Sequence, residues 1–118
     1  MENLMLRAPD LVPTSLQMRV QHYPYIDVIP SPALRNRILA ALGNSTFVLD
    51  QEELCLDIEW GLRVWGRSAW DERSWEWSVE FVEKWLWLFE EETLASTNFW
   101  RKQRGEEIIG LTGEEADL

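Results

Sequence analysis

The fold is decided by the stretch from Trp60 to Phe89, which reads WGLRVWGRSAWDERSWEWSVEFVEKWLWLF. This stretch holds seven of the eight tryptophans of the chain. Each indole ring buries a large apolar area and gains further from edge-to-face contact with neighbouring rings. We therefore expect the core of the protein to be assembled around this stretch.

The second half of the stretch predicts the central helix, over Val79–Phe89. Ser78 precedes it and is a favoured N-cap residue. Glu80 and Lys84 are spaced i,i+4 in the favourable order. Apolar residues recur at helical spacing, at Val79, Val82, Leu86 and Phe89. We expect one continuous helix here, prolonged by the three glutamates at 90–92, around which the rest of the chain packs.

Capping residues predict further helices on the N-terminal side. Thr14 or Ser15 suits the start of a short helix that ends before Pro24. Ser31-Pro32 is typical of a helix start, and that helix runs to Leu42. Asp50 begins another, followed by an acidic first turn. Residues 54–60 also alternate between apolar and polar side chains, as a strand does, but the cap favours a helix.

The remaining segments give the domain plan. Gly61–Ser78 fits no period, so we expect an ordered loop pinned by its own tryptophans, with a short strand at Leu62–Trp65 or Trp75–Trp77 as an alternative. Ser96 or Thr97 caps a last short helix to Arg104. The sequence thus predicts a mostly α protein: a small single-domain helical bundle with a long Trp-rich ordered loop. Residues 1–13 are an extended lead-in, 14–105 the helical domain, and 106–118 an acidic tail.

Charge and composition exclude several function classes. The 118 residues carry a formal net charge of −10, concentrated in residues 50–100. No basic patch of useful size exists for binding nucleic acid. Cys55 is the single cysteine, which excludes an internal disulfide and fits a reducing compartment. No run of about 18 apolar residues exists, so we expect no membrane-spanning segment.

The titratable residues do not suggest catalysis. A nucleophile–base pair would need Cys55 with His22, yet Cys55 lies between leucines, where cysteine usually behaves as a small hydrophobe. One histidine and scattered carboxylates have no metal-ligand spacing. We therefore expect no catalytic residues, no metal and no cofactor, and no enzymatic activity.

Two candidate contact surfaces remain, each with a plainer interpretation. On a continuous central helix, Trp87 shares a charged face with Glu80 and Lys84. It is either covered by the loop 61–78 or part of a partner surface. Arg101, Lys102 and Arg104 form the main basic cluster, which is either a cationic last helical turn or a partner contact.

Tryptophans also suggest a ligand pocket. Indole faces bind apolar or cationic small molecules, and base stacking would need a basic groove that is missing. The candidate lining residues are Trp60, Trp65, Trp75 and Trp85. A protein partner or self-association is the first expectation, and a small molecule is the alternative.

Three segments together resemble a known family: HYPYIDVIPSPALRNRIL (22–39), GLRVWGRSAWDERSWEWSVEFVEKWLWLF (61–89) and STNFWRKQRGE (96–106). They are similar to the domain of unknown function that follows the basic leucine zipper in many fungal transcription factors. The matching residues of the first segment are His22, Tyr25, Asp27, Pro30, Pro32 and Arg35. Those of the second are Trp65, Gly66, Trp70, Asp71, Trp75, Glu76, Lys84, Trp85, Trp87 and Leu88. Those of the third are Ser96, Thr97, Asn98, Trp100, Arg101, Arg104 and Gly105.

The resemblance implies a largely helical module of a fungal nuclear regulator and supplies no molecular activity. Tyr23 is a small departure, since it stands between His22 and Pro24. A larger one is that no basic region or leucine heptad precedes the domain, so we expect this chain not to read DNA itself. Among the matching residues, we expect Asp27 and Arg35 to pair across the Pro30–Pro32 turn. We assign structural roles to Asp27, Arg35, Trp70 and Trp100.

Overall fold

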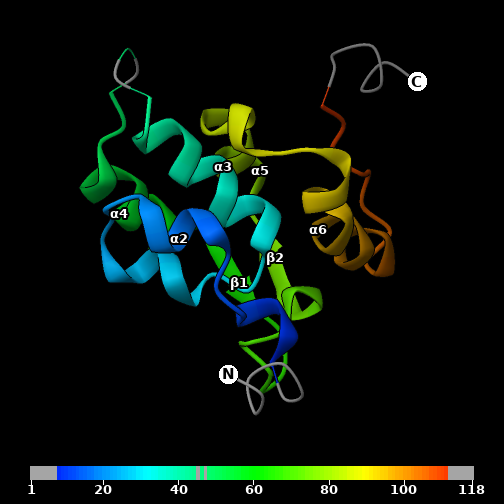
Figure 1. Ribbon diagram of the computed structural model, residues 1–118. Coiled ribbons are helices and arrows are strands. Elements are labelled where there is room, and N and C mark those ends of the chain that lie inside the picture. Colours follow the sequence, from blue (N-terminus) through cyan, green and yellow to red (C-terminus); the bar gives the residue numbers. More distant parts are fainter. Residues whose placement is uncertain (1–7, 45, 47, 112–118) are drawn as a thin grey trace.

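The computed structural model describes residues 8–44, 46 and 48–111, and it confirms a mostly α protein (Figure 1). The α-helices are α2 (Ser15–Arg19), α3 (Pro32–Leu42), α4 (Gln51–Gly61), α5 (Val79–Lys84) and α6 (Glu91–Gln103). The two strands are β1 (Leu62–Val64) and β2 (Trp75–Trp77). Short 3-10 turns are η1 (Pro9–Leu11), η2 (Pro24–Val28), η3 (Glu72–Ser74) and η4 (Leu86–Leu88). None of the helices in the described residues is long and apolar enough to cross a membrane.

The predicted caps start the N-terminal helices. The side chain of Ser31 accepts a hydrogen bond from the Leu34 N–H, and α3 runs to Leu42 as expected. Asp50 accepts from two N–H groups of α4, which confirms that residues 54–60 are helical. Thr14 caps α2 through a reciprocal capping box, but α2 ends at Arg19, earlier than predicted.

The tryptophan-rich segment forms a small hairpin. Both short strands proposed as alternatives are present, and they pair antiparallel with Leu62 opposite Trp77 and Val64 opposite Trp75. The indole N–H of Trp75 donates to the Ala69 carbonyl and so fixes the connecting segment. Gly66 in that segment has φ +73°, a left-handed conformation that glycine adopts without strain.

The prediction of one continuous central helix is wrong. α5 ends at Lys84, Trp85 has φ −110° and ψ 33°, and the 3-10 turn η4 follows. Trp85 is buried, and its indole N–H donates to Asp57 on α4 over 2.8 Å. Aromatic residues have weak helix propensity, so this tertiary anchor outweighs the local preference at the break.

The last helix also begins earlier than predicted. Glu90 is the N-cap of α6, and its backbone N–H donates to the Thr93 hydroxyl at 2.8 Å. The glutamates at 91 and 92 therefore open a helix, where acids favour the dipole, and do not extend the previous helix.

The core is centred on the ring of Trp77. Phe81 stacks on it at 4.5 Å, while Phe89 and Trp75 meet it edge-on at 6.1 and 5.6 Å. α3 crosses the middle of the molecule, with α4 on one side and α6 on the other (Figure 1). Its buried residues Leu34, Ile38 and Leu39 complete the same core.

Candidate functional site

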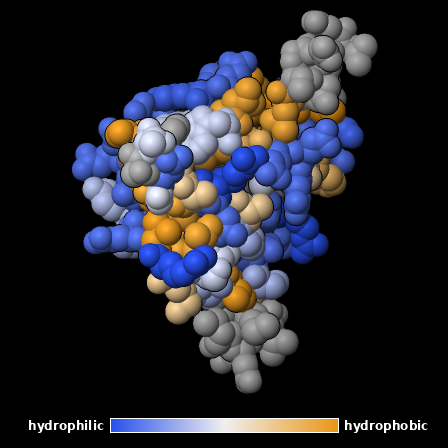
Figure 2. All heavy atoms as spheres, turned by 45° about the horizontal axis from the view of Figure 1, so that its top comes forward, coloured by the Kyte–Doolittle hydropathy of each residue, from blue (hydrophilic) through white to orange (hydrophobic). Residues whose placement is uncertain are grey.

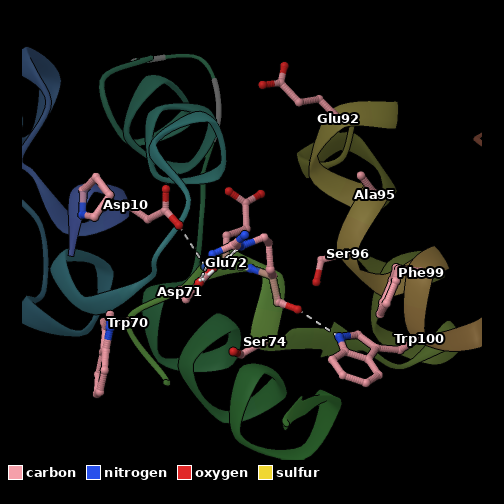
Figure 3. A pocket seen from close by; sticks show the side chains of 12 residues that line it. Asp10, Trp70, Asp71, Glu72, Ser74, Glu92, Ala95, Ser96, Phe99 and Trp100 are labelled. Atoms are coloured by element: carbon pink, nitrogen blue, oxygen red, sulfur yellow. Dashed lines mark hydrogen bonds and ion pairs between the residues drawn. The ribbon is translucent and has the colours of Figure 1, made fainter. Parts of the chain in front are cut away.

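A hollow of about 1080 Å³, open to solvent, lies between η1, η3 and α6 (Figure 3). Its lining comprises Pro9, Asp10, Trp70, Asp71, Glu72, Arg73, Ser74, Glu92, Ala95, Ser96, Phe99 and Trp100. We call this hollow the η3–α6 groove. It combines aromatic rings with carboxylates, the pairing that binds cationic groups.

The rings of the groove stand on both sides of η3. Figure 3 shows Trp70 on one side and Phe99 and Trp100 on the other, with the side chains of Asp10, Glu72 and Glu92 above them in this view. Trp70 is 47% exposed and Phe99 52% exposed. Trp100 is held in place, since its indole N–H donates to the Arg73 carbonyl and its ring stacks on Trp65 at 5.0 Å. Apolar ring surface is thus presented to solvent on a fixed support.

The carboxylates of the groove are crowded. Asp10 accepts a hydrogen bond from the Glu72 N–H, across 62 residues of sequence. Burial, together with the negative charges of Asp10 and Glu92, raises the pKa of Glu72 to about 7, although Ser31 and Arg35 act in the opposite direction. Because like charges gather here, an added cation would be stabilised.

One guanidinium also lines the groove. Arg73 is exposed, and it is held by Asp71 through a salt bridge of 2.7 Å. Hydrogen bonding from Arg73 accordingly lowers the pKa of Asp71. The pair neutralises itself, so Asp10, Glu72 and Glu92 determine the charge that the groove presents.

The four tryptophans of the predicted ligand pocket lie in different parts of the structure. Trp60 is 87% exposed at the end of α4. Trp65 stacks on Trp100 and donates to Glu76. Trp75 and Trp85 are both buried in the core. The groove instead uses Trp70 and Trp100, for which we expected structural roles, and Trp70 is half-exposed and not a core residue.

The charged face predicted around Trp87 is not continuous. Trp87 lies on η4, after the helix has ended, whereas Glu80 and Lys84 lie on α5. Lys84 makes salt bridges of 2.7 Å to Glu53 and Asp57 on α4. Trp87 itself is 38% exposed, with its ring 6.2 Å from that of Trp85.

The predicted basic cluster is largely engaged within the chain. Arg104 binds both carboxylate oxygens of the buried Glu76, at 2.7 and 2.6 Å, and also contacts Glu106. This pairing lowers the pKa of Glu76. Arg101 donates to the Glu107 carbonyl, while Lys102 is exposed. Both arginines are thus engaged within the chain, Arg101 by the segment just after α6 and Arg104 mainly by Glu76 on β2.

The predicted direct pair of Asp27 and Arg35 is replaced by a bridged arrangement. The side chain of Gln17 donates to Asp27 at 2.8 Å and accepts from Arg35 at 2.7 Å. Arg35 is fully buried, and its guanidinium donates to the carbonyls of Asp10, Val12 and Ile29. Arg35 therefore ties the segment before α2, which includes groove residue Asp10, to α3.

The candidates for catalysis remain apart from the groove. The ring of His22 contacts the Val20 carbonyl and Asp27, and the largest effect on its pKa is a lowering by burial that these two contacts outweigh, so the pKa is raised. Cys55 is half-buried on α4. Among the residues that the structure describes, no group of histidine, cysteine and carboxylate side chains is arranged to hold a metal ion.

A family model described as "Domain of unknown function (DUF3425)" matches residues 2–97. The chain belongs to this family. Comparison with curated proteins and with solved structures gave no match in either set. The match covers the segment before α2, the hairpin and the first half of α6, and thus most of the elements that form the groove.

The acidic side of the groove is not predicted by the sequence. The pattern around Asp10 predicts an extended lead-in, but the chain forms the turn η1 there and Ala8 is buried. The segment around Glu72 follows neither helical nor strand periodicity, so its sequence does not predict where the Glu72 side chain lies. Ile109, which the sequence places in an acidic tail, likewise packs against the core, and its backbone N–H and carbonyl both bond to the side-chain amide of Asn98.

Proposed function

We propose that this chain is a regulatory, protein-interaction module of a fungal bZIP-type transcription regulator, that it acts in the nucleus, and that it does not itself read DNA. The observation that carries the interaction role is the η3–α6 groove, which exposes Trp70 and Phe99 beside carboxylates. Exposed aromatic residues in a concave surface are typical of protein-binding sites. The regulatory context rests on the three sequence segments that resemble the bZIP-associated domain.

The surface outside the groove supports an interaction module as well. Figure 2 shows apolar side chains gathered in several patches amid hydrophilic surface. Leu56 is 57% and Trp60 87% exposed along α4. Patches of this kind on a small domain mark contacts with other macromolecules.

The charge distribution supports the absence of direct DNA reading. The chain carries a net charge of −10, and a duplex-binding face requires a basic surface. Arg101 and Arg104, the arginines of its basic cluster, are engaged by acidic or carbonyl oxygens of the same chain.

The test joins the full chain to a heterologous DNA-binding domain in a fungal reporter strain. A regulatory module should change reporter transcription at least about threefold relative to the DNA-binding domain alone. The chain by itself should leave the mobility of a duplex unchanged at about 0.15 M salt, where surface charges are screened within about 8 Å. An unchanged reporter, or a shifted duplex, would contradict the proposal.

A small-molecule-sensing domain is the second candidate, and the groove favours it because ligand pockets typically measure about 300–1,000 Å³. The groove volume of about 1080 Å³ lies just above that range. Native mass spectrometry of the purified chain tests this candidate. A mass excess of a few hundred daltons over 13.9 kDa would support a bound ligand, and a clean monomer mass would leave the interaction module as the explanation.

A further inference from the structure

We infer that the η3–α6 groove binds an arginine-bearing peptide segment of a partner protein, with guanidinium groups stacked on the exposed rings of Trp70 and Phe99 and paired with the groove carboxylates, among them Glu72 and Glu92. This inference rests on the proposed interaction function and names the surface and the chemistry of the partner. It follows from three properties of the groove: its charge, its rings and its open shape.

The negative charge of the groove favours the binding of a cation. Four carboxylates line it against a single guanidinium, that of Arg73, which Asp71 already engages. The three other acids come from η1, η3 and the first turn of α6, so they surround the hollow from separate elements. Crowded carboxylates of this kind repel one another, and a bound cation relieves that repulsion.

The rings favour arginine over other cations. A guanidinium stacks flat on aromatic faces and donates to carboxylates in a planar fork, whereas an ammonium is a compact, strongly hydrated point charge. Trp70 and Phe99 present exposed faces on either side of η3 (Figure 3). The groove thus offers aromatic rings and carboxylates together, and a guanidinium can stack on the first and form paired hydrogen bonds with the second.

The shape of the groove favours an extended segment. The hollow is open to solvent and bounded by three separate elements, so a chain can pass through it (Figure 3). Apolar surface contributed by Ala95 beside Phe99 can cover the methylene stems of the bound side chains. Nucleic acid is disfavoured, since its phosphates would meet the same carboxylates.

The probe is a fluorescein-labelled octa-arginine peptide, whose binding to the full chain is followed by anisotropy at about 0.15 M salt, with octa-lysine and octa-glutamate as comparison peptides. We expect octa-arginine to bind several-fold more tightly than octa-lysine, and octa-glutamate not to bind. Absence of octa-arginine binding, or equal binding of the two cationic peptides, would overturn the inference.

Matched variants separate the groove from the general acidity of the chain. Glu92→Gln and Glu52→Gln each remove one carboxylate from the first turn of a helix, α6 and α4 respectively, and only Glu92 lines the groove. We expect Glu92→Gln to weaken octa-arginine binding about 3–10-fold and Glu52→Gln to weaken it less than twofold. Equal losses would show that only net charge matters and would overturn the inference.

A second pair tests the aromatic contact. Trp70→Ala removes a groove ring, and Trp60→Ala removes an exposed ring elsewhere. Because both rings are exposed, we expect both variants to fold, as checked by circular dichroism. Binding should fall about 5–10-fold in Trp70→Ala and less than twofold in Trp60→Ala, and the reverse order would contradict the assignment. A dimer of the free chain that Trp70→Ala dissociates would assign the groove to a second copy instead.

The outcomes distinguish this inference from the function on which it rests. If the tethered chain still changes reporter transcription while octa-arginine fails to bind, the groove assignment fails and the regulatory function stands. If octa-arginine binds as predicted while the reporter is unchanged, the groove stands and the regulatory function fails.

Discussion

Replacement of Arg35 by methionine tests the bridged arrangement that joins the segment before α2 to α3. Methionine keeps much of the length and apolar volume of the side chain but removes every donor. In the wild-type protein the buried guanidinium donates to the carbonyls of Asp10, Val12 and Ile29, at 2.6 and 2.8 Å for the first two. Arg35→Met therefore leaves the Asp10 and Val12 carbonyls without this donor, while the Ile29 carbonyl keeps the N–H of Ser31 as a donor.

The cost follows from the burial of those carbonyls. A buried acceptor left without a partner costs about 1–3 kcal/mol, and the contacts to Asp10 and Val12 are partly buried. The sum is about 2–4 kcal/mol, out of a total stability of about 5–15 kcal/mol for a domain. At about 3–5 °C per kcal/mol for a chain of this size, Tm should fall by about 6–20 °C.

Urea unfolding and a thermal scan of the purified chain measure this loss, and the m-value should stay unchanged. Arg37→Met is the matched control, because Arg37 lies on the same helix and makes an exposed salt bridge to Glu90. It should cost less than about 1 kcal/mol. The reasoning is refuted if Arg35→Met is as stable as Arg37→Met.

Asp27→Asn separates the bridged arrangement from a direct ion pair. Asp27 reaches Arg35 only through Gln17, so loss of its charge should cost about 1 kcal/mol or less. A cost equal to that of Arg35→Met would instead indicate a direct electrostatic pair.

Three further predictions concern single contacts. Glu72 has its pKa raised to about 7, so the folded state binds an extra proton that is lost as the pH rises through 7. The unfolding free energy of the wild-type protein should therefore fall as the pH rises from about 4.5 to about 8, whereas that of Glu72→Gln should not. Relative to wild type, the variant should gain about 1–2 kcal/mol of unfolding free energy over this range, after a discount for partial exposure. A difference between the two proteins that urea titrations find constant with pH would contradict this. Gly61→Ala places a Cβ 2.7 Å from that of Phe81 and should cost about 1–3 kcal/mol of unfolding free energy, whereas an unchanged urea midpoint would refute the clash. Arg104→Met leaves the buried Glu76 carboxylate without its cation, which lowers the pKa of that carboxyl in the wild-type protein. The variant should lower the urea midpoint at pH 7 and lower it less near pH 3, where the carboxylate becomes protonated. An equal shift at both pH values would exclude the ion pair.

Local chemistry in the sequence determined where most helices begin. Ser31 and Asp50 each supply a side-chain acceptor for orphan backbone N–H groups, and that need is the same whatever packs around the helix. The mostly α fold class and the importance of the tryptophan-rich stretch follow from the same local information. The sequence also indicates a structural role for Arg35, but neither its burial nor its carbonyl partners.

Only the tertiary structure decided where the central helix ends. Local spacing favours a helix to Phe89, but Trp85 is anchored by Asp57, 28 residues away, and the chain turns there. The free energy of burying one indole with its N–H satisfied exceeds the small propensity difference between helix and turn. The helical face that the sequence predicts for Trp87 is therefore not formed, because Trp87 follows the end of α5.

The groove could not be predicted for the same reason. Its acidic side brings together Asp10 and Glu72, which are 62 residues apart. Its aromatic side combines Trp70, from the segment between the two strands, with Phe99 on α6. Arg104, a candidate surface cation in the sequence, is held by Glu76 on β2, 28 residues away. A sequence pattern reports the neighbours of a residue along the chain, whereas charge neutralisation and ring exposure depend on neighbours brought together by packing. The sequence therefore determined where most helices begin and which family the chain belongs to, and the tertiary structure decided which charges and rings remain available to a partner.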